Sequence, residues 1–201
     1  TEKAIELFPS NPTFYFFNGF ANLQLKNYKN AISAFNNGIQ YIINDNFLLS
    51  EFYQYLGDAY HQNNDDLLSD DSYEESLNYN PNNTYVLNNY SYYLTLRETK
   101  LNIAEKMILR ALEISPNNVN YLDTYGWILF MKHDFVNAEV WIKKALNKTL
   151  EKNGIILEHY GDVLFHLEKV KDAILYWEKA LENGNNSSIL KEKISEKKYL
   201  K

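Results

Sequence analysis

Cysteine is absent from this 201-residue chain, and helix-breaking residues are scarce, with 7 Gly and 4 Pro. Without cysteine the chain has no disulfide framework, no thiolate zinc site and no cysteine nucleophile. The shortage of glycine and proline favours helices over a turn-rich β architecture. No apolar run approaches the roughly 20 residues that a membrane helix needs, so we expect no direct membrane span in this segment.

Aromatic residues are abundant, with 17 Tyr, 11 Phe and 3 Trp, and the formal net charge is -6. Residues 1–100 carry 12 Asp and Glu against 5 Lys and Arg, so this half of the chain would repel a phosphate backbone. Basic pairs such as Lys143 and Lys144 have the spacing of solvated helix faces. We therefore expect no nucleic-acid partner.

Two segments near the C-terminus repeat one another. Gly126 and Gly161 are 35 residues apart, as are Ala138 and Ala173, and in both copies a large residue stands four positions before the glycine. A small residue lets two helices of one unit approach closely, and the later alanines seat the second helix against its neighbours. Pro81 and Pro116, each followed by Asn-Asn, predict helix ends with asparagine caps for the next helix.

These spacings resemble the tetratricopeptide repeat, a helix-turn-helix unit of about 34 residues. The resemblance implies an all-α fold, a right-handed α-α superhelix (solenoid), with five repeats at about 12–45, 50–83, 84–118, 119–152 and 154–187. Residues 1–11 would end a preceding repeat. Residues 188–201 would form a polar capping helix with Ile189, Leu190, Ile194 and Leu200 on one side.

The chain departs from the repeat pattern at a few positions. Ser91 replaces the usual Gly, and one extra residue near 98–101 lengthens the turn of that repeat. Ser69 and Ser76 stand where Ala is usual. The additional residues between 44 and 49 are interpreted as a loop insertion.

In the family that the chain resembles, the first helix of each repeat lines a concave groove. None of its thirty inward positions is Lys or Arg here, so the groove lacks a basic clamp for a peptide carboxylate. Aromatic and acidic side chains favour an apolar or basic protein segment as the partner. The candidate protein-binding residues are Phe16, Phe17, Phe20, Tyr55, Asp58, Tyr85, Tyr92, Asp123, Trp127, Phe130, Glu158, Asp162 and Phe165. Alternatively, these aromatics pack against a neighbouring repeat or an inserted helix of the same protein.

Catalytic and metal-binding motifs are not evident. The chain has no Gly-rich phosphate loop, nucleophile elbow or zinc-protease helix, so we predict no catalytic residue and no cofactor. His159, Asp162 and His166 share a helix face at i, i+3, i+7 spacing. A solvated groove face is the preferred interpretation of these three residues over a zinc site.

The resemblance implies a protein-protein interaction scaffold or adaptor and not an enzyme. The alternative is a non-catalytic, substrate-selecting or regulatory segment of a larger enzyme. Residues 122–130 and 158–165, with 177–181, look like the C-terminal repeats of bacterial envelope lipoproteins that carry tetratricopeptide arrays. That likeness implies an envelope complex, in the periplasm or anchored to the outer membrane. The partner and the oligomeric state stay open at this point.

Overall fold

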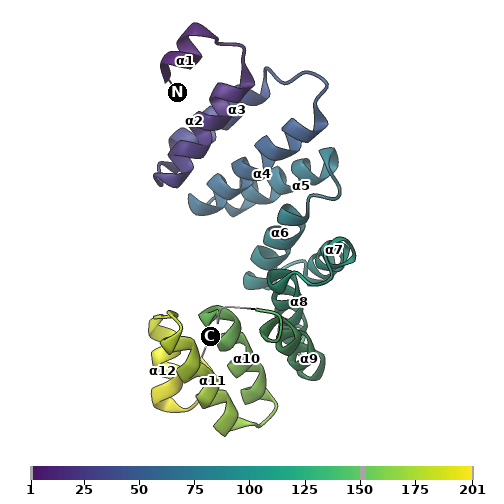
Figure 1. The fold of residues 1–201 in the computed structure, drawn as a ribbon, viewed down its shortest axis with the longest axis vertical. Helices are drawn as coiled ribbons and strands as arrows, with labels where there is room; N and C mark the ends of the chain where they lie inside the picture. Colours follow the sequence, from purple (N-terminus) through teal and green to yellow (C-terminus); the bar gives the residue numbers. More distant parts are fainter. Residues whose placement is uncertain (1, 150–152, 201) are drawn as a thin grey trace. The chain divides into compact units, whose positions relative to one another are not determined.

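The computed structural model describes residues 2–149 and 153–200, and the secondary structure of these residues is helical throughout (Figure 1). Residues 150–152, where the expected boundary between the fourth and fifth repeats falls, lie outside the described residues, as do Thr1 and Lys201. The helices are α1 Glu2–Leu7, α2 Pro12–Gln24, α3 Tyr28–Ile39, α4 Asn46–Gln62, α5 Asp66–Tyr79, α6 Thr84–Leu96, α7 Leu101–Ile114, α8 Val119–Met131, α9 Phe135–Leu146, α10 Gly154–His166, α11 Val170–Glu182 and α12 Ser188–Glu196.

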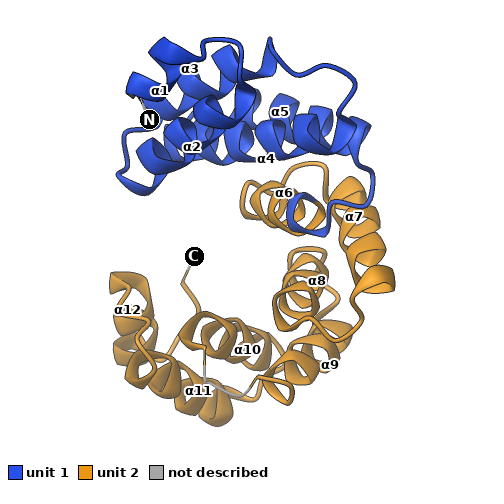
Figure 2. Ribbon diagram, turned by 45° about the horizontal axis from the view of Figure 1, so that its top comes forward, with its two compact units in different colours: residues 1–86 blue, residues 87–201 orange. Residues whose placement is uncertain are grey.

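The chain forms two compact units, unit 1 with residues 1–86 and unit 2 with residues 87–201 (Figure 2). In unit 1, α2 packs on α3 and α4 on α5; in unit 2, α8 packs on α9 and α10 on α11. Each pair is joined by a short turn, so its two helices run antiparallel. The expected all-α fold of paired, stacked helices is therefore what each unit shows.

A glycine in the first helix of a pair faces a large side chain in the second. A Cβ placed on Gly126 would lie 2.4 Å from Ile142 Cγ1, and one placed on Gly161 would lie 2.4 Å from Trp177 Cδ1. The same contact joins Gly19 to Phe35 and Gly57 to Tyr73. The proposed role of glycine in allowing close approach is thus confirmed, because no other residue type leaves room for these side chains.

The serines that replace small residues are buried and hydrogen-bonded. Ser91 Oγ lies 2.6 Å from the Leu87 carbonyl oxygen and 2.9 Å from that of Ala104, which bridges α6 and α7. Ser69 Oγ donates to the Gly57 carbonyl at 2.9 Å, and Ser76 Oγ donates to the Ser50 carbonyl at 2.8 Å. Because each hydroxyl has a partner, these polar substitutions fit the repeat without an unsatisfied buried donor.

The helix α4 begins at Asn46 and not at residue 50, so the interpretation of residues 44–49 as a loop insertion was wrong in part. Asp45 Oδ1 accepts a hydrogen bond from the backbone N–H of Leu48 at 2.9 Å and caps the helix. The residues after this cap therefore continue as helix. In contrast, the extra turn residue expected near 98–101 is confirmed, since that turn runs over 97–100 while the equivalent turn in α8–α9 runs over 132–134.

The asparagines that follow the two prolines cap helices as expected. Asn118 Oδ1 accepts from the backbone N–H groups of Asn120 and Tyr121 at the start of α8. Asn83 Oδ1 accepts from the Val86 N–H at the start of α6. These caps set where α6 and α8, two helices of the candidate surface, begin.

Candidate protein-binding surface

In unit 1 the inward face carries a cluster of aromatic rings from α2 and α4. The ring of Tyr55 lies 5.4 Å from that of Phe16 and 5.5 Å from that of Phe20, centroid to centroid, in edge-to-face geometry. Phe17 is 54% exposed and Phe20 is 37% exposed. Phe16, Phe17, Phe20 and Tyr55 therefore form an accessible aromatic surface, which we call the aromatic ledge.

Next to the aromatic ledge, Asp58 is buried and fully engaged. Tyr73 donates its hydroxyl hydrogen to Asp58 Oδ1 at 2.6 Å, and Tyr85 donates to Oδ2 at 2.8 Å. Burial raises the pKa of the Asp58 carboxyl, and the two tyrosine hydrogen bonds offset part of that effect. Asp58 thus links α4 to α5 and to the start of α6 through these hydrogen bonds, and its carboxylate is not available to a ligand.

In unit 2 the first helices enclose a hollow of about 300 Å³ whose walls are rich in side-chain amides. Its lining consists of Asn88, Asn89, Tyr92, Tyr93, Asn120, Asp123, Thr124, Asn153, Ile155 and Ile156. Thr124 Oγ1 donates to Asn88 Oδ1 at 2.9 Å, and Asn88 Nδ2 donates to Asn89 Oδ1 at 3.0 Å. This amide hollow therefore has ordered polar groups, with one exposed aliphatic side chain, Ile155, at its edge.

Beneath the amide hollow, Asp123 and His159 form a buried pair. His159 Nδ1 lies 3.0 and 3.1 Å from the two carboxylate oxygens of Asp123. Burial lowers the pKa of His159, but the charge of Asp123 and its hydrogen bond outweigh burial, so the net pKa is raised. The Trp127 ring stacks on His159 at 4.1 Å and on Phe130 at 4.6 Å. Trp127 Nε1 is buried and has no hydrogen-bond partner among residues 2–149 and 153–200. Asp123, Trp127 and Phe130 are therefore part of the packing of unit 2.

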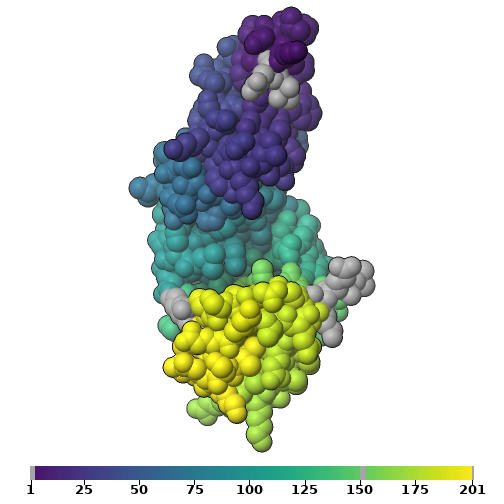
Figure 3. Space-filling model, turned by 90° about the vertical axis from the view of Figure 1, so that its left-hand side faces the viewer, coloured from purple at the N-terminus to yellow at the C-terminus, as the bar shows by residue number. Residues whose placement is uncertain are grey.

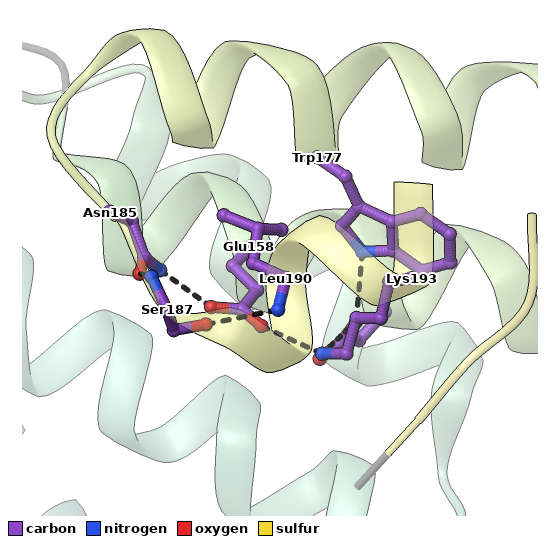
Figure 4. Close-up of polar contacts among 7 residues, drawn as sticks. Glu158, Trp177, Asn185, Ser187, Leu190 and Lys193 are labelled. Carbon is purple, nitrogen blue, oxygen red and sulfur yellow. Dashed lines mark hydrogen bonds and ion pairs between the residues drawn. The ribbon is translucent and has the colours of Figure 1, made fainter. Parts of the chain in front are cut away.

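A second buried charge cluster joins α10, α11 and α12 (Figure 4). Lys193 Nζ lies 2.8 Å from both carboxylate oxygens of Asp162 and 2.8 Å from Glu158 Oε1. Trp177 Nε1 donates to Asp162 Oδ1 at 2.9 Å, and Asn185 Nδ2 donates to Glu158 Oε2. Burial raises the pKa of Asp162 to about 6, against the opposing effect of the Lys193 charge. We call Glu158 and Asp162 the acid pocket.

Sequence reasoning missed Lys193. The expected capping helix placed only apolar residues on its inner side, but Lys193 is 3% exposed and Leu190 is fully buried. A signal was present, because Lys193 follows Leu190 by three positions and so shares its helix face. The statement that no inward position is basic holds for the five first helices of the repeats but not for α12.

The candidate residues thus divide into two sets. Accessible or half-buried are Phe16, Phe17, Phe20, Tyr55, Tyr85, Tyr92, Glu158 and Phe165. Buried are Asp58, Asp123, Trp127, Phe130 and Asp162. The expectation that the three aspartates present free carboxylates to a basic ligand is corrected: each one has a partner within its own unit, since an isolated buried charge would be costly.

The His159, Asp162 and His166 side chains are directed to different partners. His166 stacks on Phe135 with ring centroids 4.6 Å apart, while the other two belong to separate charge clusters. Within residues 2–149 and 153–200, no group of three or more His, Cys, Asp and Glu side chains could hold a metal ion. Among the helices in these ranges, none is long and apolar enough to cross a membrane.

Comparison with known families identifies residues 50–83 as a tetratricopeptide repeat. No curated protein sequence matches the chain significantly. The match covers α4 from residue 50 onward, α5 and the turn after it, and these elements carry Asp58 and its partner Tyr73.

Solved structures extend this likeness over nearly the whole chain. Pseudomonas aeruginosa PilF matches with a TM-score of 0.74 and 17% identity, covering 92% of this chain and 83% of its own. TTC0263, a tetratricopeptide protein of Thermus thermophilus, matches with a TM-score of 0.70 and 15% identity, covering 92% and 98%. A chain of the Cut9–Hcn1 hetero-tetramer of the APC/C matches with a TM-score of 0.82 and 14% identity, covering 98% of this chain and 38% of its own. Residues 50–83 are thus a tetratricopeptide repeat, and nearly the whole chain has the paired-helix fold of solved tetratricopeptide-repeat structures.

Proposed function

We propose that this protein is an adaptor that holds an apolar segment of a partner protein against the first helices of its repeats. The observation that carries the proposal is the accessible aromatic ledge on α2 and α4, together with the amide hollow over α6, α8 and α10. Large exposed aromatic rings and ordered polar groups are each typical of protein interfaces, and each unit offers one of the two.

The chemistry of the two surfaces supports an apolar segment. Rings such as Phe17 and Phe20 gain most from burying aliphatic or aromatic side chains. Side-chain amides both donate and accept hydrogen bonds, so Asn89 and Asn120 suit the N–H and C=O groups of a peptide main chain. The acidic side chains support a basic segment less well than the sequence indicated, because Asp58 and Asp162 are buried and already paired.

The test begins with affinity capture by the full chain and identification of the recovered protein by mass spectrometry. The recovered partner is then titrated against variants of the chain. Phe17→Ala and Phe20→Ala should each weaken binding by about 30-fold, the equivalent of about 2 kcal/mol for an aromatic hot spot. Leu67→Ala is the matched control, because Leu67 is an exposed apolar residue on α5, a second helix of the same unit.

The opposite pattern would contradict the proposal. If Leu67→Ala abolishes binding while both phenylalanine variants bind normally, the partner uses the second helices and not the aromatic ledge. Circular dichroism of each variant checks that the helical fold is retained.

We also propose that the adaptor acts in a bacterial envelope complex, on the basis of the likeness of residues 122–130 and 158–165 to envelope lipoprotein repeats. Cell fractionation of the full-length protein tests this location, and recovery in the cytoplasm alone would contradict it. A catalytic domain in the full-length sequence would instead support the alternative of a substrate-selecting segment of an enzyme.

A further inference from the structure

The C-terminal segment of the chain folds back onto unit 2. Lys197 has a left-handed backbone with φ 53° and ends α12. After this turn, the Tyr199 ring lies 4.8 Å from the ring of His166 on α10 and 5.9 Å from that of Phe130 on α8, centroid to centroid. A helix that only covered the end of the stack would contact α10 and α11, whereas this segment reaches α8.

Two side chains anchor the segment. Lys193 enters the acid pocket, where its ammonium group contacts Glu158 (Figure 4) and Asp162. The same ammonium group lies 5.2 Å from the centre of the Tyr199 ring. Tyr199 forms one wall of a small cavity of about 140 Å³, whose other lining residues include Phe130, Phe135 and His166. The two anchors thus lie six residues apart in sequence.

A buried ammonium is not what end-capping requires. Covering the apolar face of α11 needs residues such as Leu190, and an apolar side chain at position 193 would usually be as stable as a buried ion pair. A desolvated lysine between two carboxylates adds specificity for the bound segment, because only a long side chain that ends in a cation can pair with both acids. The geometry therefore has the features of a recognition site that is occupied by the chain itself.

The outer surface of the segment is polar and exposed. Lys191, Glu192, Ser195 and Glu196 of α12 all face solvent, and the yellow atoms of this segment form the visible surface at this end of unit 2 (Figure 3). The side chains that attach the segment are Leu190 and Lys193, which are buried, and Tyr199, which is half-buried against His166.

We infer that residues 186–200 are an internal ligand of unit 2, bound at a docking site for a helix that presents a lysine and is followed, six residues after that lysine, by an aromatic ring. The inference rests on the proposed adaptor function. It adds a binding site for a lysine side chain, which a partner can occupy only after the internal segment is displaced. A partner segment of the same chemistry would compete with residues 186–200 for the acid pocket. Because the internal segment is tethered, its effective concentration is on the order of millimolar, and a free ligand must overcome it.

The test uses the full chain and a fluorescein-labelled peptide of residues 186–200. Tyr199→Ala and Lys193→Ala should loosen the internal segment, so each variant should bind the peptide at least tenfold more tightly than the unmodified chain does. Lys191→Ala is the matched control, because Lys191 is exposed on the same helix, and it should bind as weakly as the unmodified chain. A peptide carrying Lys193→Ala should lose at least tenfold in affinity for the Tyr199→Ala chain.

Hydrogen exchange provides a second measurement. Amides of residues 188–196 should exchange faster in the Tyr199→Ala chain, while those of α11 stay protected. If Lys193→Ala fails to fold, Tyr199→Ala alone decides the question, since Tyr199 is only half-buried and its truncation leaves the packing of α10 on α11 intact. A folded Tyr199→Ala chain that binds the peptide no better than the unmodified chain would show that residues 186–200 are a fixed cap and overturn the inference. That result would leave the proposed function in place, because the aromatic ledge is tested with a separate partner titration.

Discussion

The contact between Gly126 and Ile142 predicts that the smallest possible enlargement of a side chain in α8 destabilises the protein. Replacing Gly by Ala inside a helix ordinarily stabilises it by about 1 kcal/mol, through the better helix propensity of alanine. At position 126 the new Cβ would lie 2.4 Å from Ile142 Cγ1 and 3.1 Å from the Ile142 backbone nitrogen. Ordinary carbon–carbon contacts are about 3.5–4.0 Å, so α8 and α9 must separate by about 1 Å.

Ile142 cannot relieve this clash by moving. Its side chain is fully buried, and a β-branched residue in a helix has one strongly preferred χ1 rotamer. Overpacking of this kind costs about 1–3 kcal/mol, and the short distance places Gly126→Ala toward the upper end of that range. After subtraction of the propensity gain, we expect a net destabilisation of about 1–2 kcal/mol, and more for Gly126→Leu.

A double-mutant cycle separates packing from propensity. In an Ile142→Ala background the 2.4 Å contact with Cγ1 is gone and the 3.1 Å contact with the backbone nitrogen remains, so Gly126→Ala should destabilise the protein much less than it does in the unmodified chain. Urea denaturation followed by circular dichroism gives the midpoints, with an unchanged slope as the check that the same structure unfolds. If Gly126→Ala stabilises both backgrounds equally, close helix approach is not the reason for glycine at this position.

Three further outcomes follow from the buried polar groups. The denaturation midpoint should rise when the pH falls from 7 to 5. In the folded state the pKa of Asp162 is raised to about 6, and the pKa values of Asp58 and His159 are raised as well. The stability that these groups contribute is therefore present below their unfolded pKa values and is lost as the pH rises through their folded pKa values. Asp162→Asn should reduce this rise, and a midpoint that falls between pH 7 and 5 would contradict the assignment. Tyr73→Phe should destabilise unit 1 by about 1–3 kcal/mol, because Asp58 loses a buried hydrogen-bond donor, whereas Tyr85→Phe should cost less since Tyr85 is 43% exposed; equal effects in urea denaturation would argue against this ranking. Trp177→Phe should lower the midpoint as well, through loss of the hydrogen bond to Asp162, and a variant as stable as the unmodified chain would show that this bond contributes nothing.

The repeat architecture could be predicted from the sequence because it depends on local rules. Helix periodicity, the scarcity of glycine and proline, and caps such as Asn118 act within a few residues. The glycine contacts are almost as local: two helices joined by a short turn are necessarily neighbours, so Gly161 and Trp177 must meet once both helices form. Two helix boundaries were predicted wrongly. Residues 46–49 are helical because Asp45 caps α4, and the C-terminal helix ends at Glu196 because the left-handed backbone of Lys197 stops it before Leu200.

The state of the charged groups could not be predicted in this way, because it depends on side chains from helices that are distant in sequence. Asp123 and His159 are 36 residues apart, and Lys193 is 31 residues from Asp162. Inward positions of a repeat show only that a carboxylate points toward a groove; whether it is solvated or neutralised depends on which side chain the next helix supplies. The sequence by itself therefore determined the helix pairs and the aromatic ledge, through periodicity and short turns. Only the tertiary structure decided that Asp58, Asp123 and Asp162 are buried and paired and that the chain's own Lys193 occupies the acid pocket, because burial and charge pairing are properties of the packed helices together.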